Sequence, residues 1–169
     1  VHVSDDLNGD GIIDLEDGVI NVANNSLVIC YNSAGTGAQY NVAVGLTALS
    51  DAGLTGNYNV AIWYNALTAH TEGLHNTAVG NASLYSNTKG ENNTALGDAS
   101  LQNNTTATNN TAVGQASLYK NNAGYQNTAQ GWRRLYENTE DNNNTAVGFK
   151  SLYENTEGSF NTALGYNAG

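Results

Sequence analysis

The sequence predicts an all-β fold, a parallel β-solenoid (β-roll) of about eight 17-residue coils preceded by an irregular N-terminal calcium-loop segment. Three observations support this prediction: a repeat of nearly fixed period, a period too short for paired helices, and a composition rich in Asn, Thr and Gly. The tripeptide Asn-x-Ala recurs after one step of 18 residues and then six steps of 17 residues. A period kept this strictly is the signature of a stacked-repeat architecture. The tripeptides begin at Asn41, Asn59, Asn76, Asn93, Asn110, Asn127, Asn144 and Asn161.

Each unit is expected to contain two short strands and two turns. A helix-pair repeat needs about 34 residues and a leucine-rich repeat about 20–29, and Asn, Thr and Gly are poor helix formers. We expect the first strand at Asn-Thr-Ala-Val/Leu, ended by Gly, and the second around Ala-Ser-Leu-Tyr. The tyrosine that follows the repeated leucine should then face away from it, because successive side chains of a strand point to opposite faces. The second turn is expected at Asn-Thr-x-Gly, as in 87–90, because Asn and Gly tolerate positive φ.

Stacking the units explains the choice of side chains. Coils about 4.8 Å apart would align equivalent residues in rows along the rod, and eight coils would reach roughly 38 Å. A thin coil has room only for Ala, Val and Leu, whereas stacked Asn and Thr can hydrogen-bond along the rod as amide ladders do in other stacked β structures.

Beyond the period itself, the unit N-T-A-V-G-x-x-S-L-Y-x-N-T-x-G, found at 76–90, resembles a known family. It resembles repeats of bacterial and phage surface fibres, including proteins that end in a tail-fibre chaperone domain. It is also similar to the shorter head repeats of trimeric autotransporter adhesins, which form parallel β-rolls. The resemblance covers residues 41–169 and implies an extracellular or cell-surface, elongated, structural or adhesive protein, commonly a homotrimer.

The N-terminal segment, residues 1–40, is expected to be a calcium-loop and capping or junction segment, ahead of a solenoid domain at 41–169. Calcium prefers six to eight oxygen ligands, and an EF-hand-type loop supplies them at fixed positions. Gly11 would allow the sharp turn of such a loop, which is similar to the Ca²⁺ loops of dockerins, with Asp at the last position. The alternative is a solvated acidic turn. The predicted ligands of this structural Ca²⁺ site are Asp6, Asn8, Asp10, Ile12 through its carbonyl, Asp14 and Asp17.

Composition argues against several classes of function. Five basic residues and a net charge of −10 argue against a nucleic-acid partner, since the overall field repels phosphates. No stretch approaches the ~20 apolar residues of a membrane span. We expect no enzyme, because the repeats are mostly neutral and hold no convergent catalytic set. His70 and His75 flank a turn and are expected at the surface.

Two further sets of residues are candidates for interaction or modification. Trp132, Arg133 and Arg134 replace the usual x-Ala-Ser of the repeat and could dock an acidic partner or a sugar ring, or equally form a solvated irregular coil. Asn-x-Ser/Thr acceptor patterns would be glycosylated in a glycosylating secretory pathway, although the repeat itself also generates them. They occur at Asn24, Asn81, Asn92, Asn103, Asn104, Asn109 and Asn143.

The expected function is an extracellular structural subunit of a fibre or filament, assembled from stacked β-solenoid units. The partner would be another copy of the chain. In a head-to-tail filament, a neighbour would cover the open strand edge after Asn161. The other possible assembly is a homotrimer. The alternative is a trimeric adhesin head that binds glycans or a surface. Ice binding by the row of Thr residues is a third, weaker hypothesis, because these Thr alternate with Ala and stand beside Asn.

Overall fold

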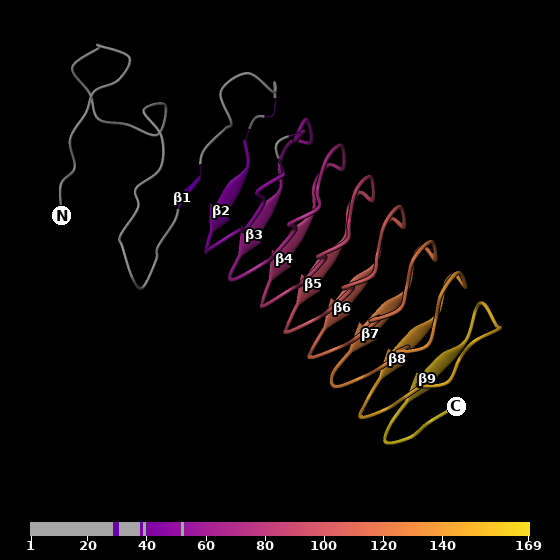
Figure 1. The fold of residues 1–169 in the computed structure, drawn as a ribbon. Helices are drawn as coiled ribbons and strands as arrows, with labels where there is room; N and C mark the ends of the chain where they lie inside the picture. The colour runs from indigo at the N-terminus through magenta and orange to yellow at the C-terminus, as the bar shows by residue number, and fades with distance from the viewer. Residues whose placement is uncertain (1–28, 31–37, 39, 52) are drawn as a thin grey trace, which may run out of the picture.

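The computed structural model describes residues 29–30, 38, 40–51 and 53–169 of the chain (Figure 1). The predicted calcium ligands between Asp6 and Asp17, and the acceptor Asn24, lie outside the described residues.

The described chain forms one sheet of nine short strands that pair in the order of the sequence (Figure 1). Strands β2 to β9 are parallel, and β3 to β9 align each residue with the one 17 positions further along. This confirms the all-β, parallel β-solenoid fold. At the N-terminal side, β1 runs antiparallel to β2 and covers its edge. The strands are β1 (Ile29–Cys30), β2 (Val42–Val44), β3 (Val60–Ile62), β4 (Thr77–Val79), β5 (Thr94–Leu96), β6 (Thr111–Val113), β7 (Thr128–Gln130), β8 (Thr145–Val147) and β9 (Thr162–Leu164).

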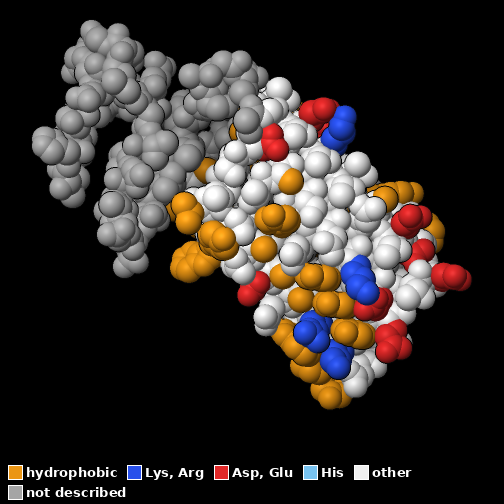
Figure 2. All heavy atoms as spheres, in the orientation of Figure 1, with side chains coloured by type: hydrophobic (Ala, Val, Ile, Leu, Met, Phe, Trp, Pro, Cys, Tyr) orange, Lys and Arg blue, Asp and Glu red, His pale blue; other side chains and the backbone are white. Residues whose placement is uncertain are grey.

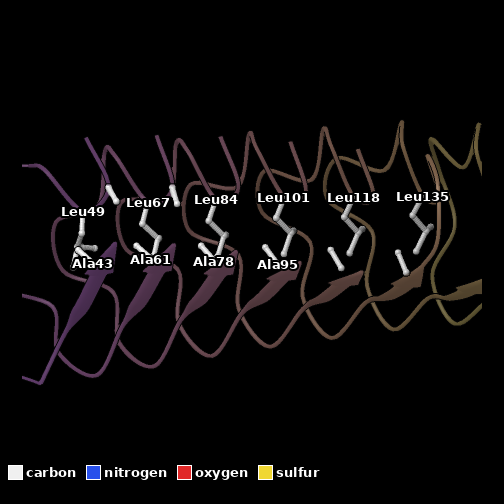
Figure 3. Close-up of a cluster of buried hydrophobic side chains, with 14 of the residues drawn as sticks. Ala43, Leu49, Ala61, Leu67, Ala78, Leu84, Ala95, Leu101, Leu118 and Leu135 are labelled. Carbon is white, nitrogen blue, oxygen red and sulfur yellow. The ribbon is translucent and has the colours of Figure 1, made fainter. Parts of the chain in front are cut away.

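Each parallel strand turns only its central alanine inward. The alanines form a buried row that faces a row of buried leucines from the far wall of the coil (Figure 3). The first and third residues of each strand point out of the solenoid, as the alternation of a strand requires. The core of each coil is therefore one Ala and one Leu thick, which explains why larger side chains are absent from these positions.

The predicted second strand is wrong, because the segment around Ala-Ser-Leu-Tyr is a turn. Ser83 and Leu84 are consecutive residues and both are fully buried, which a strand with alternating faces cannot achieve. A left-handed backbone at Leu84, with φ of 49°, turns both side chains inward. The leucines of this row have φ between 44° and 50°, a conformation that costs roughly 1–2 kcal/mol and is offset by about 1.5–3 kcal/mol from leucine burial. They are Leu49, Leu67, Leu84, Leu101, Leu118, Leu135 and Leu152.

Two ladders of buried asparagines join the coils, as predicted. In the first, the Oδ1 atom of Asn76 accepts the backbone N–H of Asn93 at 3.0 Å, and its Nδ2 donates to the carbonyl of Gly90 at 2.8 Å. In the second, Asn104 Nδ2 donates to Asn87 Oδ1 one coil earlier. These amides pair the buried backbone groups that a three-residue strand leaves without a partner. Because these bonds recur from coil to coil, they hold equivalent residues of successive coils in register.

Candidate functional site: an aromatic and basic surface

Trp132 follows the glycine that ends β7, at the first position of a solvent-facing corner. The equivalent positions 17 and 34 residues later hold Phe149 and Tyr166. Their rings stack along the rod, with centroids 5.0 Å apart for Trp132 and Phe149 and 5.1 Å for Phe149 and Tyr166. The indole Nε1 donates to Gln115 Oε1 in the preceding coil at 3.1 Å. The Trp132 side chain is thus fixed by neighbours on both sides.

A second aromatic column is formed by the tyrosines that follow the buried leucines. The ring centroids of Tyr119 and Tyr136 are 5.0 Å apart, and those of Tyr136 and Tyr153 are 5.2 Å apart. The rings are nearly parallel, with interplanar angles of 2° and 11°. The prediction that the tyrosine row faces away from the leucine row is confirmed, since these rings reach the surface while the leucines are buried.

Two basic residues lie between the columns. The guanidinium of Arg133 lies 4.6 Å from the Trp132 ring centroid and 5.5 Å from that of Tyr136. Lys150 Nζ lies 5.2 Å from the Tyr153 ring centroid. We call this surface the aromatic-basic strip; Figure 2 shows basic side chains set among hydrophobic ones toward the C-terminal end. The strip consists of Tyr119, Trp132, Arg133, Tyr136, Phe149, Lys150, Tyr153 and Tyr166.

Two acidic residues adjoin the tyrosine column. Glu137 and Glu154 directly follow Tyr136 and Tyr153 in the sequence. Glu137 is held at 2.6 Å by Lys120, and this hydrogen bond raises the pKa of the lysine. Lys120 is therefore engaged by a carboxylate, whereas the structure gives Arg133 and Lys150 no ion pair among the described residues.

Arg134, predicted to belong to the surface patch, is instead buried, with 5% of its surface exposed. It occupies the position that holds Ser83, Ser100 and Ser117 in other coils, where each hydroxyl donates to a glycine carbonyl of its own coil at 2.9 Å. Its Nε and Nη1 atoms have no hydrogen-bond partner. Burial lowers the pKa of the guanidinium, because the charged form loses its hydration.

The Arg134 guanidinium lies against Gly131, where the next coil would otherwise stack directly. Backbone hydrogen bonds to that next coil are long. The N–H of Gly148 reaches the carbonyl of Gln130 at 3.3 Å, whereas equivalent bonds at the other glycine corners measure 2.5–2.9 Å. The bond from Leu135 to Ser151 is also 3.3 Å, against 2.9–3.0 Å for the other leucines of the row. The arginine thus wedges apart the coils that contain β7 and β8.

His70, expected at the surface, is fully buried and takes an asparagine position in the second ladder. Its Nε2 lies 2.8 Å from the carbonyl of Gly73, and Asn87 Nδ2 lies 3.1 Å from its Nδ1. This arrangement fits the neutral ring with its proton on Nε2. Burial lowers the pKa of His70, and backbone hydrogen bonds to Gly73 and Asn87 oppose that shift only in part. His75 does reach the surface, where it stacks on Tyr58.

The glycosylation candidates divide by position in the coil. Asn104 is fully buried and its Nδ2 donates to Asn87 Oδ1 and the carbonyl of Ala107, so a glycan on this atom is incompatible with the folded ladder. Asn92 and Asn109 are exposed. The remaining described candidates, Asn81, Asn103 and Asn143, are half-buried.

The outer face of the sheet contains no charged residue from β2 to β9. Its rows are Val or Thr at the first strand position and Val, Ile, Leu or Gln at the third. The Asn that precedes each strand from β2 to β8 is buried, so neither Ala nor Asn interrupts this face there; Asn161 before β9 is half-buried. In β9, Leu164 is 77% exposed, and within the described residues the edge of β9 opposite β8 pairs with no strand.

The chain matches no protein-family model, no curated protein sequence and no solved structure. The resemblance to fibre and adhesin repeats therefore stays a prediction. None of the described residues forms a helix long and apolar enough to cross a membrane. Sequence reasoning missed Phe149, Lys150 and Tyr166, although a search for aromatic or basic residues 17 or 34 positions after Trp132 and Arg133 would have found them.

Proposed function

We propose that this protein is a rod-shaped structural subunit of an extracellular fibre or filament. The observation that supports it most directly is the in-register repetition of the same contacts from coil to coil. Asn59, Asn76 and Asn93 each accept the backbone N–H of the next asparagine at 2.9–3.0 Å. Each coil is therefore a template for the next, and stiffness and length follow from adding coils.

End-to-end growth would use the edge of β9 opposite β8, which pairs with no strand among the described residues. A parallel edge with unpaired N–H and C=O groups readily accepts another strand. Leu164 and Tyr166 are 77% and 74% exposed beside this edge, and a further solenoid unit would cover both. The N-terminal segment would form the other side of the junction, with Ca²⁺ bound by the loop between Asp6 and Asp17.

Cryo-electron microscopy and sedimentation velocity of paired variants test the assembly. We expect filaments with a subunit repeat of about 40 Å, since eight coils stack at about 4.8 Å each. Leu164→Asp should abolish them by placing a charge at the junction. Leu96→Asp is the matched control, because Leu96 holds the same strand position in β5, away from the end. Loss of assembly in Leu96→Asp with filaments kept in Leu164→Asp would refute head-to-tail growth and indicate lateral contacts through the outer face.

A second candidate function is recognition of a ligand or surface by an adhesin-like head. The specific observation that favours it is the aromatic-basic strip, in which aromatic and basic side chains gather on an otherwise acidic rod. A trimeric head would bury the uncharged outer face of the sheet between copies. If the strip binds, isolated protein should bind its ligand and Trp132→Ala should lose it.

A further inference from the structure

We propose that the aromatic-basic strip binds a carboxylated polysaccharide, laid along the rod axis. This inference rests on the second candidate function, ligand recognition, and gives its ligand a chemical class. It does not depend on whether the rods assemble into filaments.

The orientation of the rings favours an anionic ligand. Rings stacked along the rod at 5.0–5.2 Å cover one another's faces and turn their edges to solvent. The edge of an aromatic ring carries the positive part of its quadrupole, and its face the negative part. Arg133 and Lys150 lie over ring faces, so their charges add to the positive edges. Arg133 and Lys150 thus give the strip two positive charges on a chain of net charge −10, with the exposed Glu154 at its border.

The two basic groups suit carboxylates in particular. The planar guanidinium of Arg133 presents paired N–H donors that match the two oxygens of a carboxylate. Contact with the Trp132 and Tyr136 rings holds this group in place at the surface. The neighbouring carboxylate Glu137 is engaged by Lys120 at 2.6 Å, which leaves Arg133 for a ligand.

The spacing argues against an extended acidic peptide as the ligand. Arg133 and Lys150 occupy equivalent positions in adjacent coils, one coil rise or about 4.8 Å apart along the rod. Same-face side chains of an extended peptide recur only every ~6.7 Å, so an acidic peptide falls out of register with the coils. The hydroxyls of Tyr136 and Tyr153 can donate to the oxygens of a sugar chain laid along the rod.

Titration of the protein with oligogalacturonate, followed by calorimetry, tests the proposal. The matched neutral probe is the methyl-esterified oligosaccharide, which keeps the sugar rings and removes the charge; polyglutamate represents the acidic peptide. We expect the oligogalacturonate to bind at least tenfold more tightly than either comparison, with an affinity that falls as salt rises.

The Arg133→Gln/Lys150→Gln double variant should weaken oligogalacturonate binding at least tenfold. Lys89→Gln is the control, because Lys89 is exposed and pairs with Glu72 away from the strip. Circular dichroism of both variants establishes that they fold. Absence of binding, equal binding of the ester or polyglutamate, or equal loss in Lys89→Gln would overturn the proposal. Binding of the oligogalacturonate outside the strip would keep ligand recognition as a function but reject the strip as its site.

Discussion

Replacing Arg134 by serine should stabilise the protein, although the change removes a large buried side chain. Arg134 leaves two buried N–H groups unpaired, and each such group costs about 1–3 kcal/mol. A serine restores the residue of the other coils, whose hydroxyl bonds a glycine carbonyl at 2.9 Å and contributes about 0.5–1.5 kcal/mol. Loss of the buried arginine stem offsets roughly 1–2 kcal/mol of this gain. We therefore expect Arg134→Ser to raise the free energy of unfolding by about 3–4 kcal/mol.

The gain should be local, because repeat proteins are stabilised by contacts between neighbouring coils. Urea unfolding measures its size, and amide hydrogen exchange at Gly148 and Leu135 reports whether the two long bonds of 3.3 Å have tightened. Ser117→Arg makes the converse change in a regular coil and should lose a similar free energy. Arg133→Ser, at the half-exposed neighbour, is the control for removal of a charge.

If Arg134→Ser instead lowers the urea midpoint, the guanidinium must be paired or hydrated in solution. Arg134 would then not act as a wedge between the coils that contain β7 and β8. If the variant is more stable but amide exchange at Gly148 and Leu135 is unchanged, the gain in stability does not come from tightening of the two long hydrogen bonds.

Three further changes test the interior and the N-terminal segment. The folded chain lowers the pKa of His70, so the contribution of this residue to stability should be complete above about pH 6.5. As the pH falls below that value, the protein should lose up to ~1.4 kcal/mol of stability per pH unit. His70→Asn should remove this pH dependence in thermal melts. Asn110→Ala should cost about 1–3 kcal/mol in urea unfolding, because the Asn127 N–H loses its partner while the Gly124 carbonyl keeps only Asn121 Nδ2. Thr106→Ala, at an exposed position, should cost little. Calcium should raise the melting temperature of the wild type but not of Asp10→Ala; equal shifts in the two proteins would reject the loop as the site.

The sequence alone determined the period, the parallel stacking and which residues share a row. A 17-residue step aligns Asn76 with Asn93 whatever path the coil takes between them. The repeat period alone therefore predicts which residues stack in the ladders. The buried Ala row was also predictable, since it follows from alternation within a short strand. The tyrosines face outward as predicted, but they lie in a turn and not in the expected strand.

Only the tertiary structure decided the path of the chain through the second half of each coil. Local propensity favours a strand at Ala-Ser-Leu-Tyr, but closure of so small a coil requires Ser83 and Leu84 to point inward together, which forces a left-handed leucine. The same closure places whatever occupies the serine and asparagine positions inside the coil, and so Arg134 and His70 are buried despite their polar character. Charge and polarity predict exposure for an isolated residue, but in a solenoid the position within the coil determines burial, because the stacked neighbours fix the backbone on both sides.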